Sequence, residues 1–446
     1  MTATLPDKPA AAAPDQAPRT GWRDNPDVKR LGACLAVALV VAVMTGPSGS
    51  ANHLTAGVRG SLLSPRVLVF LAIGALVGGL AILGKRANRS VGATLAPLNA
   101  TRARLLADGR VRYPVYGVLL LLAILLPQVL QPFWQRVLVD QIGIFVLLAL
   151  GLNVVVGLAG LLDLGYIAFF AIGAYTTAYF TGALPVKPFI HLNPFLVLPL
   201  AVLACLIAGV LLGGPTLRLR GDYLAIVTLG FGEIVRITAV NSDKITNGPR
   251  GAFGIPHFSV DLFGISYKWT LDSVPYYYLL LVFVLGTMLA LSRLENSRVG
   301  RAWTAIREDE VAAAATGVPT LRFKLLAFAI GASTSGFAGV LYASKIGFVS
   351  PDNFPLTLSI LVLVLVIFGG MGSLPGVVIG AAVLQWLPNA LRDRVPPPDR
   401  PIYFGALLVV MMIFRPQGIL PSRRRSREIA LAEAGIGGAD SLGPAQ

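Results

Sequence analysis

The apolar run YYLLLVFVLGTMLAL (residues 277–291) is followed closely by the charged run GRAWTAIREDEVAAAATGVPTLRFK (residues 300–324). The first run has no charged residue and has the composition of a helix that lies in bilayer hydrocarbon. The second run carries four basic and three acidic residues, in a chain that is only 13% charged. This contrast predicts membrane spans that are interrupted by a charged, helical segment outside the membrane.

The composition of the whole chain agrees with that interpretation. Of its 446 residues 55% are hydrophobic, and the mean hydropathy is +0.72. Further apolar runs occupy residues 195–212 and 356–368. Because an α-helix satisfies its own backbone hydrogen bonds in lipid, the sequence predicts an all-α polytopic membrane protein in a lipid bilayer.

Apolar segments of about the length of a span recur along the chain, and we predict about 10–12 transmembrane helices with loosely defined ends. Several segments are short or lie beside a proline, such as Pro127, Pro199 and Pro375, so some are expected to be broken or re-entrant. The predicted spans are 31–46, 67–84, 115–130, 137–158, 161–182, 195–213, 223–240, 276–293, 325–344, 356–371, 375–390 and 402–414.

The chain divides by composition into four parts. The beginning is rich in Ala, Pro, Asp and Arg and has no apolar core, which is typical of a disordered polar tail and not of a signal peptide. The expected parts are a tail (1–30), two spans with a basic loop (31–114), the main transmembrane domain (115–421) and a second tail (422–446).

The net charge of +15 raises the possibility of nucleic-acid binding, but the Lys and Arg residues fall in short connections between apolar spans and not on one soluble domain. Basic connections of membrane proteins face the cytoplasm. We therefore predict no nucleic-acid partner and a multi-pass protein with both termini cytoplasmic. The cytoplasmic connections include 85–114, 214–222 and the charged run, whereas the nearly balanced connections 183–194 and 241–275 are expected on the outer side.

Motifs of nucleotide or metal chemistry occur only as near misses. Gly79–Lys85 has the G-x-x-x-x-G-K spacing of a phosphate loop, but Arg86 stands where Ser or Thr would bind magnesium. GFGEIV (residues 230–235) lacks the third glycine of a dinucleotide site, and neither a zinc-protease nor a nucleophile-elbow motif occurs. We expect no cofactor, no metal site and no catalytic residue, so any ATP hydrolysis would take place on another chain.

Four polar residues inside the predicted spans are candidates for packing or for a transport pathway. Glu233 and Arg236 lie three residues apart, which places them on one face of a helix. They can be a neutralised pair that fixes packing, or they can line a pathway. Asn153 can bond across helices, and Asp163 lies near the cytoplasmic ends of two spans.

The charged run itself predicts a short cytoplasmic helix from Trp303 to Ala315. Gly317 and then Pro319 supply the usual signals for a helix end near Thr316. Ala302, Ile306 and Ala313 can share a face with Trp303. The helix could lie on the bilayer with Trp303 as its anchor, or it could dock onto a protein partner. Three consecutive acids, 308–310, argue against contact with anionic lipid.

The same run resembles the coupling loop of ABC importer permeases, in which a Glu is followed by alanines and a downstream Gly. Longer strings in the same order resemble the LivM-type permeases of branched-chain amino acid ABC transporters, and the resemblance covers about residues 115–421. These strings are GLNVVVGLAGLLDLGYIAFFAIGAY (151–175), LRLRGDYLAIVTLGFGEIVRI (217–237), GRAWTAIREDEVAAAATG (300–317), GFVSPDNF (347–354), GGMGS (369–373) and RPQGIL (415–420).

The resemblance implies a subunit of an importer in a bacterial inner membrane. It would act with a homologous second permease, two ATP-binding subunits and a periplasmic amino-acid-binding protein that delivers leucine, isoleucine or valine. The charged run would sit in a groove of an ATPase subunit. The residues expected there are Arg301, Trp303, Arg307, Glu308, Asp309, Glu310, Ala312, Ala313 and Gly317.

Other functions fit the residues too. An ion-coupled secondary transporter that works alone would use Glu233 or Asp163 as its proton or ion site, and a channel or a membrane scaffold is also compatible with the spans. Related permeases carry urea, short amides or other amino acids, and a shared fold does not fix the substrate.

Overall fold

A computed structural model describes residues 120–121, 123–216, 222–262, 265–390, 392, 405, 408–409, 411 and 417–420. All of them belong to Gly117–Gln446, the second of two compact units of the chain. The predictions for residues 1–114 and 422–446, the start of the predicted span 115–130 and most of the predicted span 402–414 lie outside the described residues.

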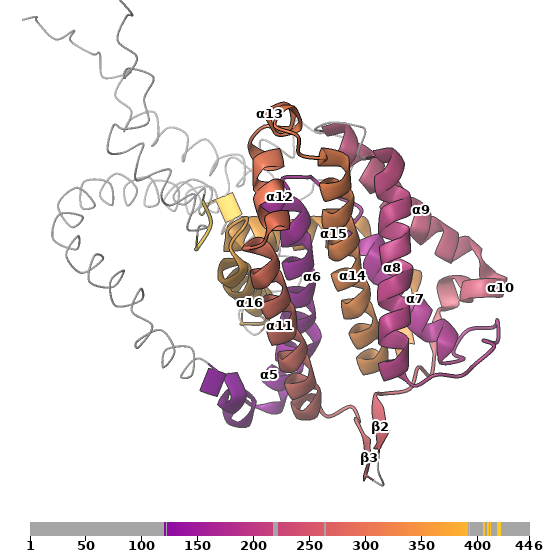
Figure 1. Ribbon diagram of the computed structural model, residues 1–446. Helices are drawn as coiled ribbons and strands as arrows, with labels where there is room; N and C mark the ends of the chain where they lie inside the picture. The colour runs from indigo at the N-terminus through magenta and orange to yellow at the C-terminus, as the bar shows by residue number, and fades with distance from the viewer. Residues whose placement is uncertain are drawn as a thin grey trace, which may run out of the picture. The chain divides into compact units, whose positions relative to one another are not determined.

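The described part is a bundle of apolar helices (Figure 1), which confirms the predicted all-α membrane class. Six helical segments within it are long and apolar enough to cross a membrane, and two further apolar helices are shorter. The long segments are Pro132–Leu158, Pro194–Thr216, Tyr223–Asn241, Ser273–Glu295, Thr320–Ile346 and Pro351–Gly369, and the short ones are Ile167–Phe180 and Leu374–Ala390.

The first long segment forms the centre of the bundle. It runs through α5 (Pro132–Arg136), η2 (Val137–Gly143), α6 (Ile144–Leu152) and η3 (Asn153–Leu158), and both η2 and η3 are π-helical. Eight of the nine residues of α6 are buried. Since a helix that is apolar all round must be covered on every side, its composition places it at the core.

Helix α14 (Thr320–Ile346) crosses α7 (Ile167–Phe180) and α8 (Pro194–Thr216) at close range. The crossing with α7 depends on glycine. A Cβ built on Gly173 would lie 2.3 Å from the main-chain oxygen of Gly336, so no larger residue fits without a shift. Small residues of this kind let helices approach closely in membranes.

The remaining helices complete the bundle: α9 (Asp222–Asn241), α11 (Ser273–Glu295), α15 (Leu356–Gly369) and α16 (Leu374–Ala390). Each coincides with a predicted span to within a few residues. The prediction for 161–182 is wrong at its start, because α7 begins only at Ile167. Residues 159–166 leave the helix after η3, where Gly160 adopts a left-handed φ of 72° that favours glycine.

The connection from Asn241 to Ser273 is rich in turns, as its Asn, Gly and Pro content predicts. It contains α10 (Asp243–Thr246) and η4 (Gly248–Arg250), joined through the left-handed Asn247. Short strands, which the sequence did not predict, follow: β1 (Ala252–Phe253) pairs antiparallel with β4 (Phe348–Val349), and β2 (Ser259–Leu262) pairs with β3 (Ile265–Lys268). A turn of 3-10 helix, η5 (Pro351–Asn353), leads into α15.

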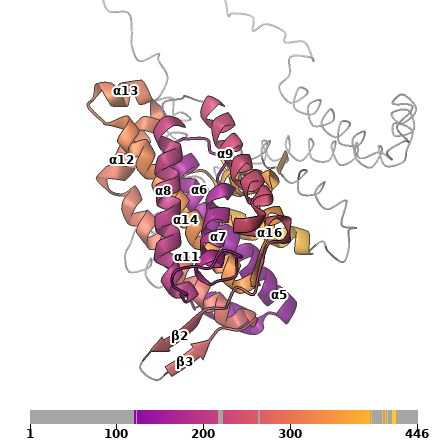
Figure 2. The same ribbon diagram turned by 90° about the vertical axis from the view of Figure 1, so that its right-hand side faces the viewer.

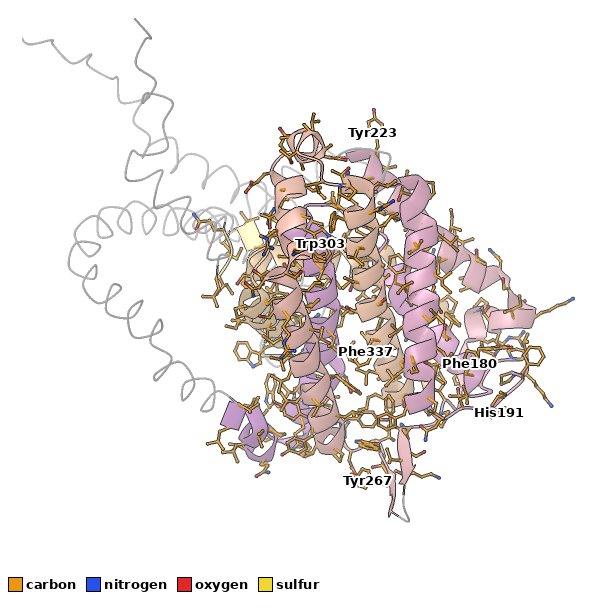
Figure 3. All side chains as sticks on the ribbon, viewed as in Figure 1. Phe180, His191, Tyr223, Tyr267, Trp303 and Phe337 are labelled. Carbon is orange, nitrogen blue, oxygen red and sulfur yellow. The ribbon has the colours of Figure 1, made fainter. Side chains whose placement is uncertain are left out.

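The bundle has two different ends. In Figures 1 and 2, α12 (Arg298–Glu308) and α13 (Glu310–Ala315) lie at one end and the β2–β3 hairpin lies at the other. Figure 3 places Tyr223 at the α13 end and His191 with Tyr267 at the hairpin end. Of the described residues, the charged run and Tyr223, which follows the predicted cytoplasmic connection 214–222, therefore lie at one end, whereas His191 and Tyr267, from connections predicted to face outward, lie at the opposite end (Figures 1 and 3).

Candidate functional site

The charged run forms two helices at one end of the bundle, and not the single helix that was expected from Trp303 to Ala315. Ser297 begins α12, and its Oγ accepts from the main-chain N–H of Val299 at 3.1 Å. Asp309 then interrupts the helix with an extended backbone, at φ −154° and ψ 110°. Its Oδ1 accepts from the N–H groups of Val311 and Ala312 at 2.8 and 3.0 Å.

The break has a physical cause in the side chain of Asp309. Aspartate is among the best residues to cap the start of a helix and competes with the backbone inside one. The helix therefore restarts as α13 at Glu310 and is capped at its end by Thr316. The next residue, Gly317, has a left-handed φ of 86°. The predicted helix end near Thr316 is confirmed, whereas the prediction of one continuous helix is wrong.

One face of the two helices is buried against α14. Trp303 is fully buried, and its Nε1 donates to the main-chain oxygen of Phe323 at 2.7 Å. Ile306 and Ala302 are buried on the same face of α12, and Ala313 is buried on α13. Trp303 and Ala313 thus hold the helices in place and lie away from their outer surface. Trp303 does not anchor the helix in lipid, the alternative that the residues had left open.

The opposite face of the two helices carries exposed residues. Val311 on α13 is 60% exposed. Of the predicted docking residues, Arg307 and Glu310 are partly buried. Those that are exposed, together with Val311, form what we call the outer face: Arg301, Glu308, Asp309, Val311, Ala312 and Gly317.

An ion pair ties α13 to the first turns of α14. The Nζ atom of Lys324 lies 2.5 Å from Oε1 of Glu310. The Lys324 side chain is only 3% exposed, whereas that of Glu310 is 30% exposed. A buried ammonium needs a partner, so Glu310 serves to hold α13 against the bundle.

Arg307 connects α12 to two segments that are distant in sequence. Its Nη1 donates to the main-chain oxygen of Gly157 at the end of the central helix. Gly372, in the turn between α15 and α16, lies against the same guanidinium. The main-chain N–H of Gly372 in turn donates to Oδ1 of Asn153 at 2.8 Å. Arg307 and Asn153 therefore belong to one polar junction beneath α12, a contact that sequence spacing alone does not reveal.

Asp163 lies in the connection between η3 and α7 and is fully buried. Its Oδ1 accepts from the N–H of Gly165 at 2.9 Å, while its Oδ2 has no hydrogen-bond partner among the described residues. Burial raises the pKa of the Asp163 carboxyl to about 7, although the Gly165 hydrogen bond lowers it.

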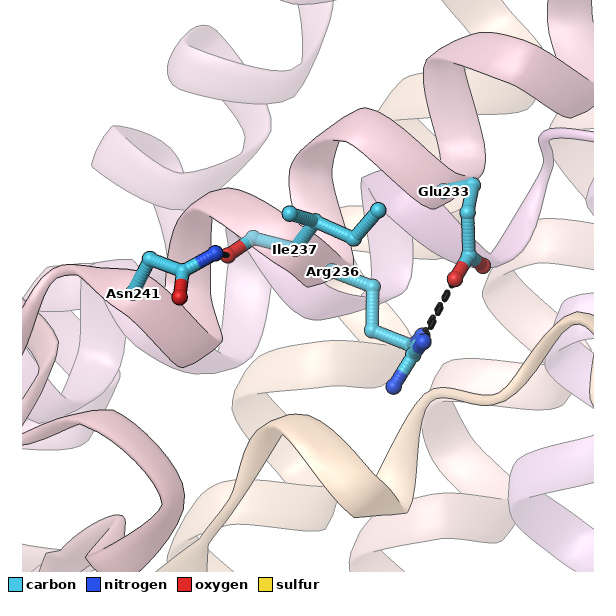
Figure 4. A network of polar contacts seen from close by, with 4 residues as sticks. All are labelled: Glu233, Arg236, Ile237 and Asn241. Carbon is cyan, nitrogen blue, oxygen red and sulfur yellow. Dashed lines mark hydrogen bonds and ion pairs between the residues drawn. The ribbon is translucent and has the colours of Figure 1, made fainter.

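Glu233 and Arg236 form an ion pair on α9, and Figure 4 shows both side chains extending from the same side of the helix. Nη2 and Nε of Arg236 lie 2.5 and 3.0 Å from Oε1 of Glu233. The pair was predicted from the spacing, and its geometry fits the neutralised-pair interpretation. The same helix also packs on the segment that carries Asp163, because the main-chain N–H of Leu164 donates to Oγ1 of Thr228 on α9 at 3.0 Å.

Two charged residues that act on each other electrostatically escaped the sequence prediction. Asp140 lies in η2 within an apolar segment, and Lys345 lies in the last turn of α14. The Lys345 ammonium donates to the main-chain oxygen of Leu271 at 2.6 Å and lies 4.7 Å from the ring centre of Tyr276. A charge inside a predicted span is the signal that would have found Asp140, whereas Lys345 lies just beyond the predicted span 325–344.

Comparison with known proteins places these features in a family. The family description "Branched-chain amino acid transport system / permease component" matches residues 137–415. The high-affinity branched-chain amino acid transport system permease protein LivM of Salmonella typhimurium is 43% identical over 339 residues, which cover 71% of this chain and 78% of that protein. LivM of Escherichia coli K12 is 44% identical over 301 residues, 63% of this chain and 68% of that protein.

A shorter similarity links the chain to a second permease of such systems. The high-affinity branched-chain amino acid transport system permease protein LivH of E. coli K12 is 32% identical over 134 residues, which cover 30% of this chain and 43% of that protein. No solved structure matches the chain.

Proposed function

The chain belongs to the family of branched-chain amino acid transport system permease components, and on that premise we propose that it is one of two permease subunits of an ABC importer. It is a multi-pass membrane protein and a transport subunit, not an enzyme. The proposal adds that it lies in a bacterial inner membrane with both termini in the cytoplasm. The second subunit would be a homologous permease, and the similarity to LivH supports a partner of that kind.

The substrates that we propose are leucine, isoleucine and valine. This part of the proposal rests on the names of the relatives, which specify branched-chain amino acids. A periplasmic binding protein would deliver the amino acid to the outer end of the bundle, where the β2–β3 hairpin lies (Figure 1). A permease of the same family that carries urea, an amide or another amino acid is the alternative. It would change the proposed substrate and leave the proposed role as a permease subunit unchanged.

Energy would reach the chain through α12 and α13. The proposal places a separate ATP-binding subunit on their outer face, where Val311 and Ala312 are exposed beside the acids of residues 308–309. The buried side of the same helices supports this role, because Trp303 and the Lys324–Glu310 pair fix them to α14. A rigidly attached helix pair transmits the motion of its partner to the spans.

The polar junction beneath α12 gives that motion a route into the bundle. Arg307 contacts both the end of the central helix at Gly157 and the turn at Gly372. A displacement of α12 therefore acts on two spans at once. Binding energy gained on the outer face would bias the bundle between an outward-open and an inward-open state.

Co-purification tests the proposal directly. The tagged chain is expressed with its chromosomal neighbours, and the proteins that remain bound after detergent extraction are identified. We expect a second permease, two ATP-binding subunits and, with substrate present, a binding protein. Proteoliposomes of the complex should take up labelled leucine only with ATP inside and binding protein outside.

Two controls separate the alternatives. The chain alone, reconstituted under a proton or sodium gradient without ATP, should carry no leucine, and uptake there would favour a secondary transporter. An intact complex that hydrolyses ATP and carries urea or an amide in place of leucine would overturn the substrate while leaving the permease assignment in place.

A further inference from the structure

The ion pair of α9 lies in the middle of a span and on a side of the helix that this chain covers only in part. The span runs from Tyr223 to Asn241, and the side chains of Arg236 and Glu233 are still 31% and 34% exposed. Charged groups at this depth are costly in lipid and usually face a bundle interior or a water-filled space. The pair therefore indicates a surface that lipid does not occupy.

A hollow lies directly beside the pair, between α7, α9 and η5. It is shallow, and its empty space of about 220 Å³ includes the open solvent at its mouth. Arg236 forms part of its wall, and the rest of the wall is almost entirely apolar. The other lining residues are Ile167, Ala168, Ala171, Gly232, Val235, Ala239, Pro351 and Phe354.

Further polar groups lie near the same hollow. The hydroxyl of Tyr175 is buried and has no hydrogen-bond partner among the described residues, and its ring centre is 6.2 Å from that of Phe354. Asp352 of η5 is exposed and acts electrostatically on both Tyr175 and Arg236. Unpaired buried hydroxyls are uncommon, so Tyr175 is a group that a bound molecule could satisfy.

These groups match the parts of an aliphatic amino acid. A guanidinium binds a carboxylate through paired N–H donors, a carboxylate binds an ammonium, and an apolar wall accepts a branched side chain. In the empty site Arg236 and Glu233 neutralise each other, and a zwitterion brings one charge for each of them. An uncharged solute such as urea would leave the pair unused.

We propose that Arg236, Glu233 and the hollow between α7, α9 and η5 form a binding site for a zwitterionic aliphatic amino acid within the transport pathway. Arg236 binds the α-carboxylate, Glu233 binds the α-ammonium, and the apolar wall around Val235 and Ala171 accepts the side chain. The inference rests on the proposed function, in which the second permease closes the open side of the hollow.

Two double variants test the site in the assembled complex with its binding protein. Glu233→Gln with Arg236→Gln keeps hydrogen bonding and removes both charges, and Glu233→Arg with Arg236→Glu keeps an ion pair with reversed polarity. A pair that only fixes packing tolerates the reversal. A site that orients a zwitterion does not, and we expect the maximal leucine uptake rate of both variants to fall at least about tenfold, since hydrogen bonds to charged groups are lost.

The binding protein sets the substrate concentration for half-maximal uptake, so that value should stay unchanged. Size-exclusion chromatography shows whether each variant still assembles. Uptake within about twofold of the parent complex in the charge-reversed variant would overturn the site, because the loss of even one such contact costs more than this. A parent complex that carries no leucine at all would instead overturn the proposed function.

A second measurement tests the proposed binding site even if a double variant fails to assemble. Val235→Cys places a thiol in the wall of the hollow, and Ile234→Cys places one beside it on the exposed side of α9. The parent chain, with Cys34 and buried Cys205, is the blank. In the complex, leucine should slow modification of Val235→Cys by a charged thiol reagent, and leucinol, which lacks the carboxylate, should not. Equal rates with and without leucine, or equal protection at Ile234→Cys, would refute the site.

Discussion

The guanidinium of Arg307 donates to the main-chain oxygen of Gly157, 150 residues earlier in the chain. One side chain thereby joins α12 to the end of the central span. Beside it lie Gly372 and, one hydrogen bond further, Asn153. This junction connects α12 directly with the interior of the bundle.

Removal of the Arg307 side chain should separate ATP hydrolysis from transport. In Arg307→Ala the junction with Gly157 is lost while the outer face stays intact, so the ATP-binding subunits should still bind. We expect leucine uptake to fall about tenfold or more, as for other losses of charge-assisted hydrogen bonds, with ATP hydrolysis largely retained. Arg322→Ala, an exposed arginine on α14, is the matched control and should leave both rates unchanged. Parallel loss of both activities would contradict a coupling role.

A charge on the outer face should prevent docking without harm to the fold. Val311 is 60% exposed, so Val311→Arg leaves the bundle intact but opposes a close-fitting partner. We expect the complex to lose its ATP-binding subunits on size-exclusion chromatography while the two permeases remain together. Leu271→Arg is the control, because Leu271 is 69% exposed near the opposite end. If Val311→Arg retains the ATP-binding subunits, another surface docks them.

The Lys324–Glu310 pair can be probed by a double-mutant cycle. Glu310→Ala leaves the buried ammonium of Lys324 without its carboxylate, at an expected cost of about 1–3 kcal/mol because a buried polar group is left unsatisfied. Lys324→Met combined with Glu310→Ala removes both charges and should cost less than Glu310→Ala alone. Thermal unfolding of the complex in detergent measures each change. Simple additivity would show that the two residues do not interact.

Asp163 should make stability depend on pH. Its pKa is about 7 in the folded protein against an ordinary value of 3.8, so the folded state binds the proton more tightly than the unfolded state. That stabilisation is complete below about pH 4 and is lost as the pH rises to about 7, at most about 4 kcal/mol at about 1.4 kcal/mol per pKa unit. The unfolding temperature should therefore be lower at pH 8 than at pH 5.

Asp163→Asn is the matched variant, because the amide stays neutral at every pH. Its unfolding temperature should change less between pH 5 and pH 8 than that of the parent chain. Domains of about 150–250 residues shift by roughly 2–4 °C per kcal/mol, and this longer chain is expected to shift by less. Equal pH dependence of the two proteins would show that another group is responsible.

The sequence predicts the spans well, since apolar composition decides where a helix can lie in lipid. It also predicts the pairing of Glu233 with Arg236, because three residues of helix bring two side chains together. The break at Asp309 was missed because a capping aspartate inside a charged run looks like one more surface charge. The Arg307–Gly157 contact was missed because it depends on tertiary packing across 150 residues, for which local spacing carries no signal.

The central helix includes two π-helical segments, η2 and η3, which lie on either side of α6. A π segment accommodates an extra residue within a helix, and one residue of helix corresponds to about 1.5 Å of rise and about 100° of rotation. If the position of the extra residue shifted along the span, one end of the helix would rotate relative to the other by a fixed step. The helix would stay continuous. The Arg307 contact is made on η3 itself, so α12 holds the central helix at one of its two π-helical segments.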